Sequence, residues 1–480
     1  PIARWMLKDL NTDCREVLLG GELSGILHPK SLAKVWKRFL GAPESNEWLR
    51  AWTLFSAARW LDARGHAKIS HIGESDGCRV NGFDLNIGFF RPMDIVVAYC
   101  ERWDTPLVTS KHHYINRLAD SGHRILYIEI PPSPLNILWR FKEFRSLTIP
   151  RLNAGVDLVR PNVWAMTGLY PLPYHRSFGG VFDKLWINEI NQRVIYPRIQ
   201  KALTKLGFLQ PVLISYYPFL FPSLDRYGFS KIIFHMVDEW QGMSGIPNSM
   251  AFLTRRMLEK ADMTIVTSQR LFERYRTYTD KIMLLRHGMD RALFEPVSRG
   301  EVASDPRLIG FSGPCIGYYG ALFKLDFDLI KSVANRCPDW NFIFIGPRGS
   351  GSRGGRGKEV MLPNVYFWPP QERKTLPAFL AGIDIFWLPF RINELSKSMS
   401  PIKVYEALSA GLPLVVSDLE ETRAVAGELA LYAVNTEEHL EMLNRSLNTQ
   451  NEADRFHRSK SVQGFDWDER YKEFSRMLTG

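Results

Sequence analysis

The sequence predicts an α/β protein with two parallel-sheet domains, preceded by a small helical appendage. Short apolar runs of strand length alternate with amphipathic helical segments along most of the chain, as in parallel sheets with crossover helices. This alternating part, about 390 residues long, exceeds one comfortable hydrophobic core, so we expect two domains. The first residues, up to about position 65, show helical patterns without intervening strands.

The first domain is expected at 90–300, and its apolar runs extend from DIVVAYC at 94–100 to KIMLLRHGMD at 281–290. Within IIFHMVDEW, His235 and Asp238 lie near the end of a predicted strand. Ligands collect at the carboxyl ends of strands in open parallel sheets, so both residues are candidate catalytic groups. A hydrogen-bonded structural role for His235 stays open.

The second domain is expected at 308–465 and carries the clearest functional pattern. An apolar run at 384–390, a polar loop at 391–399 and SPIKVYEALSAGLPLVVS at 400–417 predict a strand, a loop, a helix and a second strand. Ser400 suits the N-cap, Pro401 suits the first helical position, and Gly411 suits the left-handed residue after the helix. We therefore expect a helix over 401–410.

Lys403 and Glu406 lie three residues apart at the start of this helix and so share one face. Lys403 and the free amides of a helix start suit phosphate oxygens, whereas a carboxylate accepts hydrogen bonds from a sugar diol. The combination predicts a site for a nucleotide sugar. An ordinary surface Lys–Glu pair is the alternative.

The segment 309–421 resembles the donor-binding domain of retaining, GT-B-fold glycosyltransferases of the family 4 type. The resemblance rests on five stretches in the family's order: GYYGAL at 317–322, WNFIFIGP at 340–347, LPNVYFWPP at 362–370, AGIDIFWLPF at 381–390 and SPIKVYEALSAGLPLVVS. It implies two Rossmann-like domains facing a cleft, the first for the acceptor and the second for the donor. It also implies sugar transfer with retention and a closing helix at 466–480 that packs on the first domain.

The family often carries two Glu residues eight positions apart, the second of which contacts the donor ribose. Glu406 matches the second, but Ser398 stands at the first, and Ala321 replaces an Arg that many relatives have. These departures affect the sugar and pyrophosphate contacts. The residues that we expect to bind the donor are Gly320, Arg286, Arg391, Asn393, Ser400, Pro401, Ile402, Lys403 and Glu406. For Arg286, a plain surface turn around Gly288 is the alternative.

Candidate acceptor-binding residues follow the first strand of the first domain. They are Arg102, Trp103 and Asp104, directly after the strand, and His113, early in a helix predicted to begin at Ser110. Structural roles for these residues stay open.

Two Asp-X-Asp patterns, at 326–328 and 466–468, imitate the paired aspartates of metal-dependent sugar transferases. We expect both to begin helices, because acidic residues favour the first helical turn and neither pair follows an apolar strand. The Gly-rich stretch at 347–358 lacks the Lys-Ser/Thr ending of a phosphate-binding loop. We therefore expect neither a metal nor a cofactor.

The appendage, at 1–66, resembles the C-terminal tail of asparagine synthetase-type amidotransferases in its Trp-rich closing helix at 48–60. No stretch matches that family's Ser-Gly-Gly-containing ATP-pyrophosphatase loop, and no N-terminal Cys nucleophile is present, so we expect no amidation. Because the chain begins at Pro1, we expect a fragment of a longer product, either a fusion of two enzymes or a joined reading of neighbouring genes.

Composition indicates a basic globular protein, with 480 residues, 45% hydrophobic residues and a net charge of +10. No apolar run reaches the roughly 18 residues that span a bilayer, and the five Cys are scattered, so we expect a cytoplasmic protein. Basic, aromatic stretches such as 36–38 could contact an anionic membrane surface, peripherally at the inner membrane face. No nucleic-acid motif accompanies the charge, so we expect no nucleic-acid partner.

These features predict a glycosyltransferase of the hexosyltransferase type. It would move a sugar from a nucleoside-diphosphate sugar to a saccharide or lipid-linked acceptor in surface polysaccharide synthesis. Lys403, Arg391 and helix-start amides would stabilise the leaving diphosphate. One alternative is a nucleotide-sugar epimerase of similar fold, which needs acid-base carboxylates and no acceptor. The other is a noncatalytic glycosyltransferase-like scaffold, which Ser398 favours and the Lys403–Glu406 pair opposes.

Overall fold

The computed structural model describes residues 37, 79–80, 83–84, 92–105, 108–133, 148–176, 182–239, 245–348, 362–448 and 452–479. The chain forms two compact units, Pro1–Arg91 and Pro92–Gly480. In the first unit, the described structure is the helical residue Lys37 and the antiparallel pair of β1 (Arg79–Val80) and β2 (Phe83–Asp84). Apart from Lys37, the expected helical appendage lies outside the described residues.

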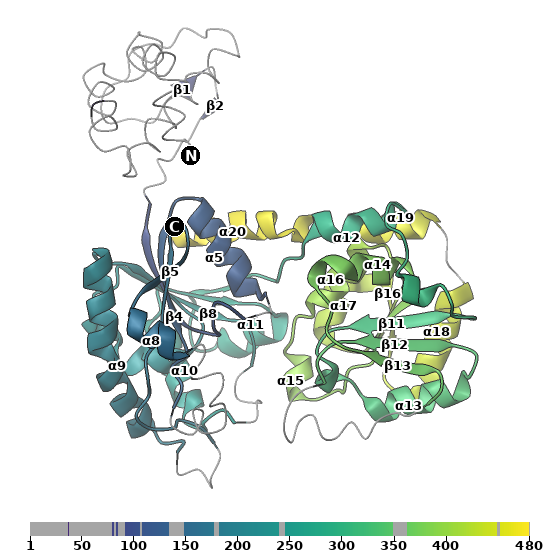
Figure 1. The fold of residues 1–480 in the computed structure, drawn as a ribbon, viewed down its shortest axis with the longest axis horizontal. Helices are drawn as coiled ribbons and strands as arrows, with labels where there is room; N and C mark the ends of the chain where they lie inside the picture. The colour runs from purple at the N-terminus through teal and green to yellow at the C-terminus, as the bar shows by residue number, and fades with distance from the viewer. Residues whose placement is uncertain are drawn as a thin grey trace. The chain divides into compact units, whose positions relative to one another are not determined.

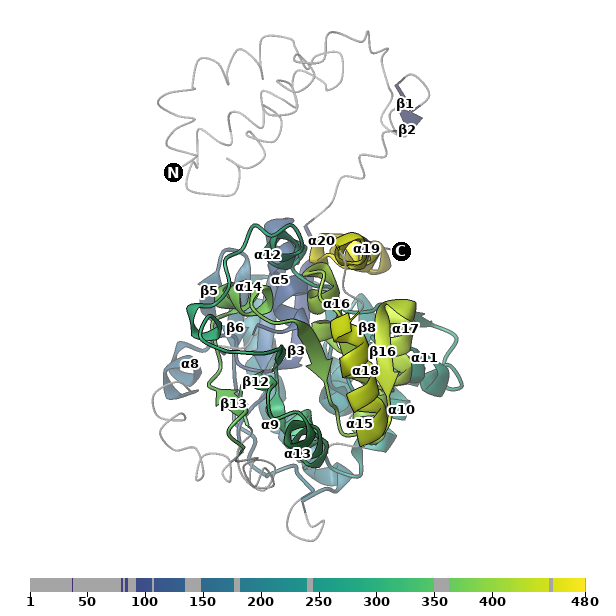
Figure 2. The ribbon, with the colours of Figure 1, turned by 90° about the vertical axis from the view of Figure 1, so that its right-hand side faces the viewer.

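The second unit contains two sheets, each with its own hydrophobic core. We call the residues around the first sheet, 92–286 with 467–479, the first lobe, and 289–465 the second lobe. Both lobes are sheets with helices packed around them (Figures 1 and 2). The predicted fold class, an α/β protein with two parallel-sheet domains, is therefore confirmed.

The sheet of the first lobe has the strand order β10-β9-β8-β7-β3-β4-β6-β5, and all neighbours are parallel except β5 and β6. The central strand β3 is wholly apolar after Asp94, and its side chains are buried on both faces, which is typical of a parallel sheet covered by helices. The strands are β3 (Asp94–Cys100), β4 (Arg124–Glu129), β5 (Asp157–Arg160), β6 (Val163–Met166), β7 (Val212–Ser215), β8 (Lys231–Met236), β9 (Met263–Val266) and β10 (Ile282–Leu284).

Helices connect these strands and cover them. They are α5 (Ser110–Asp120), α8 (Ile149–Ala154), α9 (Leu185–Leu206), the 3-10 helix η2 (Pro218–Arg226), α10 (Met250–Lys260) and α11 (Gln269–Tyr275). The final helix, α20 (Trp467–Thr479), packs against α5, and four of its residues, Trp467, Phe474, Met477 and Leu478, belong to the core of the first lobe. In Figure 1, α20 (yellow) lies beside α5.

The sheet of the second lobe is entirely parallel, with the order β13-β12-β11-β14-β15-β16. Its strands are β11 (Cys315–Tyr319), β12 (Asn341–Ile345), β13 (Val365–Trp368), β14 (Ile385–Leu388), β15 (Leu414–Ser417) and β16 (Ala430–Ala433). Its α-helices are α12 (Arg291–Ser298), α13 (Phe327–Arg336), α14 (Leu376–Ala381), α15 (Glu394–Lys397), α16 (Ile402–Ser409), α17 (Glu420–Ala426), α18 (Thr436–Asn448) and α19 (Glu452–Ser461). Its short 3-10 helices are η4 (Pro306–Leu308), η5 (Leu322–Lys324), η7 (Arg373–Thr375), η8 (Gly427–Leu429) and η9 (Gln463–Phe465).

Both Asp-X-Asp patterns begin helices, as predicted. Asp326 is the N-cap of α13, and its Oδ1 accepts hydrogen bonds from the amides of Asp328 and Leu329, both at 3.2 Å. Asp466 precedes α20, and its Oδ1 accepts from the Asp468 amide at 2.8 Å. Carboxylates that cap a helix in this way satisfy amides that would otherwise lack a partner.

The chain passes between the lobes twice, and the two passes run side by side. Met289 and Asp466 form a parallel bridge. The Met289 amide donates to the Phe465 carbonyl at 2.8 Å, and the Trp467 amide donates to the Met289 carbonyl at 3.1 Å. Gly288 lies under the Trp467 ring, because a Cβ at this position would come within 2.5 Å of the ring. The absence of a side chain at Gly288 therefore lets the two passes approach.

We expect Gly288→Ala to lower the free energy of unfolding by about 1–3 kcal/mol, the usual cost of overpacking, because the new methyl group displaces Trp467. Gly464→Ala is the matched control, since a Cβ there would meet no atom within 4 Å. Chemical denaturation of both variants measures the effect. Equal stabilities for the two variants would contradict this account.

Candidate functional site

Helix α16 begins later than the sequence suggests. It spans Ile402–Ser409, its N-cap is Pro401, and no side-chain hydrogen bond caps it. The predicted N-cap, Ser400, and the predicted start at Pro401 are therefore wrong. Pro401 keeps an extended ψ of 104°, so it takes the non-helical position before the first turn. The left-handed residue predicted after the helix is confirmed, because Gly411 has a φ of +76°.

Glu406 is 0% exposed and holds three neighbouring side chains. Its Oε2 accepts hydrogen bonds from the Tyr319 hydroxyl at 2.7 Å and from Lys403 Nζ at 2.6 Å. Arg373 Nη2 forms an ion pair with Oε1 at 3.0 Å. Burial favours a raised pKa for Glu406, but the charges of Lys403 and Arg373 outweigh it and lower the pKa below its usual value. The carboxylate is therefore ionised, and Oε1, which accepts no hydrogen bond, keeps acceptor capacity.

Tyr319 and Arg373 are two members of this network that sequence reasoning missed. Tyr319 ends β11, and Lys403 Nζ lies 4.6 Å from the centre of its ring. Its place at a strand end within GYYGAL was a signal that could have identified it. Arg373 begins η7, far from Glu406 in sequence, and its guanidinium lies 5.4 Å from the centre of the Phe294 ring. No local pattern marks Arg373.

Lys324 was also missed, although it lies three residues after Ala321 in a strand-end loop. Two contacts hold this loop to the one after β14. The Arg391 amide donates to the Lys324 carbonyl at 3.1 Å, and Leu325 forms a β-bridge with Phe390. Burial lowers the pKa of Lys324, the Lys403 charge lowers it further, and the charge of Asp238 opposes both. The charge of Lys324 therefore interacts with one residue of each lobe, Asp238 in the first and Lys403 in the second.

Asp238 follows β8 in the first lobe. Burial raises its pKa, and the positive charges of Lys324 and Lys111 oppose this rise. Within the described part of the chain, no hydrogen bond or ion pair involves Lys324 Nζ or the Asp238 carboxylate. Both side chains are half-buried, so each loses part of its hydration without a direct contact that would offset the loss.

Lys111, at the start of α5, is the second cation whose charge acts on Asp238. Its Nζ donates to Glu101 Oε2 at 2.5 Å and lies 5.1 Å and 5.5 Å from the ring centres of Tyr216 and Tyr217. Glu101 Oε1 accepts from the Thr109 hydroxyl at 2.6 Å. These contacts fix the Lys111 ammonium beside the loop after β3.

His235 lies in the core of the first lobe. Its ring centroid is 5.0 Å from that of Tyr216 and 5.8 Å from those of Tyr114 and Phe474, and among the described residues neither ring nitrogen has a hydrogen-bond partner. Burial, with the charges of His287 and Lys111, lowers the pKa of His235 to about 3. His235 is therefore neutral at physiological pH.

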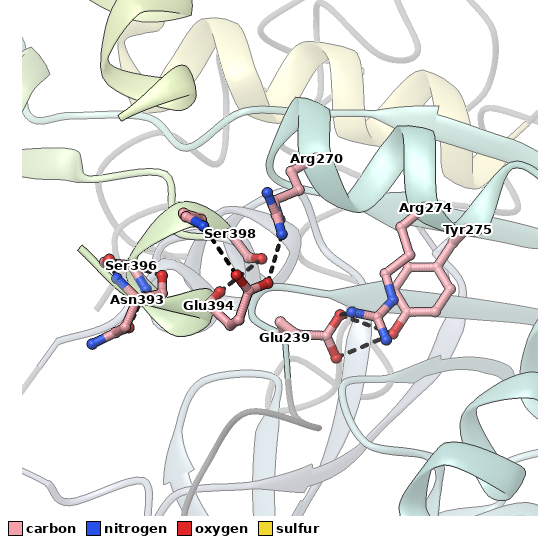
Figure 3. A network of polar contacts seen from close by, with 9 residues as sticks. Glu239, Arg270, Arg274, Tyr275, Asn393, Glu394, Ser396 and Ser398 are labelled. Carbon is pink, nitrogen blue, oxygen red and sulfur yellow. Dashed lines mark hydrogen bonds and ion pairs between the residues drawn. The ribbon is translucent and has the colours of Figure 1, made fainter. Parts of the chain in front are cut away.

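Glu239, the neighbour of Asp238, points to different partners. Its carboxylate accepts from the Tyr275 hydroxyl at 3.1 Å and forms an ion pair with Arg274 at 3.0 Å, both on α11 (Figure 3). Arg270, on the same helix, forms an ion pair of 2.6 Å with Glu394 of the second lobe. In these contacts Glu239 anchors α11.

Glu421, on α17, is 1% exposed and links the lobes near this helix. Its Oε1 accepts from Arg286 Nε at 2.9 Å and its Oε2 from the Gln269 amide at 2.8 Å, both in the first lobe. The Ser398 carbonyl accepts from the Ser268 hydroxyl at 2.9 Å. The sequence analysis placed Arg286 at the donor site and Ser398 at the position of the family's first Glu. In the structure, both residues take part in contacts between the lobes.

The other predicted donor residues lie around the ends of β11 and β14. Gly320 has a φ of +148°, and its carbonyl lies 1.9 Å from where a Cβ on Gly346 would be, so both positions require glycine. Arg391 is exposed. Asn393 Oδ1 accepts from the Ser396 amide at 3.0 Å at the start of α15. Ile402 is partly buried and packs against the core of the first lobe.

The predicted acceptor residues separate into two groups. Arg102 and Asp104 bind each other through two hydrogen bonds, of 3.0 Å and 2.8 Å, and the Trp103 ring packs against His112 and Tyr127. His113 instead stacks on Trp467 with ring centroids 4.4 Å apart. Burial and the charges of Arg373 and Arg117 lower the pKa of His113 to about 3, so His113 lies within reach of the Glu406 network.

Within the described ranges, no cluster of His, Cys, Asp and Glu could hold a metal ion. No helix in these ranges has the length and apolar character needed to cross a membrane.

Residues 316–448 match the family described as Glycosyl transferases group 1. Over 274 residues, the chain is 25% identical to the "Putative teichuronic acid biosynthesis glycosyltransferase TuaH" of Bacillus subtilis (strain 168). The match covers 54% of this chain and 65% of that protein, so the chain spans about two thirds of the relative's length. Both matches are to glycosyltransferases.

Two solved structures show the same fold. Sucrose-phosphate synthase from Thermosynechococcus elongatus superposes with a TM-score of 0.59 at 13% identity, covering 81% of this chain and 98% of that chain. Anabaena Alr3699/HepE, in complex with UDP and glucose, gives a TM-score of 0.56 at 13% identity and covers 81% and 100% of the two chains. The two-lobed architecture is therefore of the GT-B type.

We expect His235→Phe to make the protein less sensitive to acid. The pKa of His in an unfolded chain is near 6.5, whereas that of His235 in the folded protein is about 3. Between pH 6.5 and pH 3 the unfolded state therefore binds more protons than the folded state, and the free energy of unfolding falls as the pH drops below 6.5. Between pH 7 and pH 5 the parent should lose about 2 kcal/mol of unfolding free energy through His235, a loss that the variant avoids.

Urea denaturation at the two pH values measures this difference. His457→Gln, at an exposed position on α19, is the control and should keep the parent's acid sensitivity. If His235→Phe kept it too, His235 would not be buried as a neutral ring.

Proposed function

We propose that the chain transfers a sugar from a nucleoside-diphosphate sugar to a saccharide or lipid-linked acceptor of a surface polysaccharide, with retention at the anomeric carbon. The observation that carries the proposal is the set of charges around Lys324, Lys403 and Asp238. The Lys324 ammonium of the second lobe interacts with the Asp238 carboxylate of the first lobe and with the Lys403 ammonium beside it, and Lys324 and Asp238 have no direct partner among the described residues. A diphosphate is a ligand that would complete such a site.

In this proposal, Lys324 and Lys403 bind the diphosphate and stabilise the negative charge that grows on it as the sugar leaves. Lys324 takes the part of the Arg that Ala321 replaces. Gly320, Arg391, Asn393 and the backbone at Ser400–Ile402 surround the same ligand, while Arg286 acts indirectly, through its ion pair with Glu421. Glu406 holds Lys403 in place and offers Oε1 to the donor ribose.

Asp238 is the proposed proton acceptor for the attacking hydroxyl of the acceptor. Its burial raises its pKa, which makes the carboxylate a stronger base than an exposed one. The acceptor would approach along the loop after β3, past Arg102, Trp103 and Asp104, with His113 on the other side near Glu406. The catalytic role predicted for His235 stays a prediction, and the transfer rate of His235→Phe tests it.

Lys324→Met should weaken nucleoside-diphosphate binding by about 10- to 150-fold, the scale for a hydrogen bond to a charged group, with little change in stability. UDP, GDP, ADP and dTDP are first screened by thermal shift, and the best ligand is then titrated calorimetrically. Lys331→Met, at an exposed position of α13, is the control. Unchanged affinity in Lys324→Met would remove Lys324 from the site. No stabilisation by any nucleotide would favour the scaffold, and a mass-neutral sugar product would favour an epimerase.

Glu406→Gln should weaken donor binding by about 10- to 150-fold, and the 2′-deoxy donor should lose far less additional affinity in this variant than in the parent. The reason is that the hydroxyl contact is already weakened, so the two losses do not add. Titration of both donors into both proteins completes the cycle. The variant should also lose stability, because it removes a charge that balances Lys403 and Arg373. Additive losses would show that Glu406 supports Lys403 without touching ribose.

A further inference from the structure

Helix α9 presents a continuous outward face that is apolar in its first half and basic in its second. Trp186, Ile190 and Val194 follow one another at intervals of four residues and are 52%, 36% and 53% exposed. An α-helix has 3.6 residues per turn, so each residue is rotated by about 100° around the helix axis from the one before it. On this basis four further exposed residues lie within about 60° of Ile190 around the axis: Arg193, Pro197, Lys201 and Lys205. We call these seven residues the α9 face.

The charge of the α9 face is uncompensated. Within the described part of the chain, Arg193, Lys201 and Lys205 make no hydrogen bond or ion pair. The face contains no acidic residue, since Glu189 lies roughly 100° from Ile190, outside the arc. Arg226, at the end of the neighbouring η2, adds a cation beside the helix, 5.3 Å from the centre of the Tyr196 ring.

The opposite side of α9 faces the first lobe. Its buried residues include Ile195 and Ile199, and α9 packs against η2. The apolar residues of the α9 face lie outside this core, and more than a third of each side chain stays exposed. Large exposed apolar side chains beside unpaired cations are typical of a helix that lies in the plane of a membrane interface.

We propose that the α9 face docks the first lobe on an anionic lipid surface. Trp186, Ile190 and Val194 insert at the level of the headgroups, and Lys201 and Lys205 bind lipid phosphates. A second copy of the chain fits less well. The exposed parts of three apolar side chains fall far short of the roughly 800 Å² per partner that a stable dimer buries, and like cations would meet. This inference does not rest on the proposed enzymatic activity.

The test is sedimentation of the full chain with vesicles of phosphatidylcholine alone or with phosphatidylglycerol added. The parent should bind the anionic vesicles at least about tenfold more strongly. Lys201→Glu with Lys205→Glu should weaken this binding by about 30-fold or more. The control, Lys331→Glu with Lys460→Glu, changes the net charge equally at exposed positions of the second lobe and should bind like the parent.

A second pair of variants separates the membrane from other acidic partners. Trp186→Ala should weaken vesicle binding by about tenfold through lost apolar burial, whereas Phe456→Ala, at a position 61% exposed on α19, should not. The proposal is overturned if the parent fails to bind anionic vesicles, if it binds both kinds equally, or if each control loses as much binding as its test variant. Sedimentation velocity showing a dimer that the α9 variants abolish would overturn it in favour of self-association.

Discussion

The buried carboxylate of Glu406 is the interaction on which the proposed donor site depends. An ionised group that is 0% exposed is stable only when positive charge and hydrogen bonds surround it, and here Lys403, Arg373 and Tyr319 provide them. These partners come from α16, η7 and the end of β11, so one charge fixes three segments of the second lobe. The position of the Lys403 ammonium follows from it. A substitution at Glu406 would therefore affect both folding and ligand binding.

Glu421 plays a comparable part between the lobes. It accepts from Arg286 and from the Gln269 amide, so both of its oxygens are occupied by the first lobe. The two chain passes between the lobes are paired by backbone hydrogen bonds at Met289 and Asp466, and they have little freedom because Gly288 lies directly under Trp467. Movement of one lobe against the other must therefore break the Glu421 contacts and hydrate that carboxylate, or pivot about the paired segments.

Local chemistry predicted the fold well. Apolar runs such as DIVVAYC form strands with nearly the bounds that the sequence indicates, and Gly411 ends its helix as expected, because these features depend on neighbouring residues. Helix α9 escaped prediction. Its buried face includes Asn188, Asn191 and Gln192, and Pro197 lies inside it, so neither apolar periodicity nor the usual exclusion of proline marks it as a helix. Hydrogen bonds such as that from Asn188 to the Phe219 carbonyl satisfy these polar groups through the fold itself.

The candidate site was predictable only in part, for the same reason. Lys403 and Glu406 are close in sequence, so helical spacing places them together, and their contact is found. Arg373 reaches Glu406, and Lys324 reaches Asp238, through the order of the strands, which no single stretch of sequence encodes. Ser398 shows the consequence most clearly. As a departure from the family pattern it suggested a lost function, yet its carbonyl accepts a hydrogen bond from Ser268 of the other lobe, and the charges of Lys324 and Lys403 act on each other at the proposed donor site. A missing motif residue is therefore weak evidence against activity when the fold brings other charges to the same place.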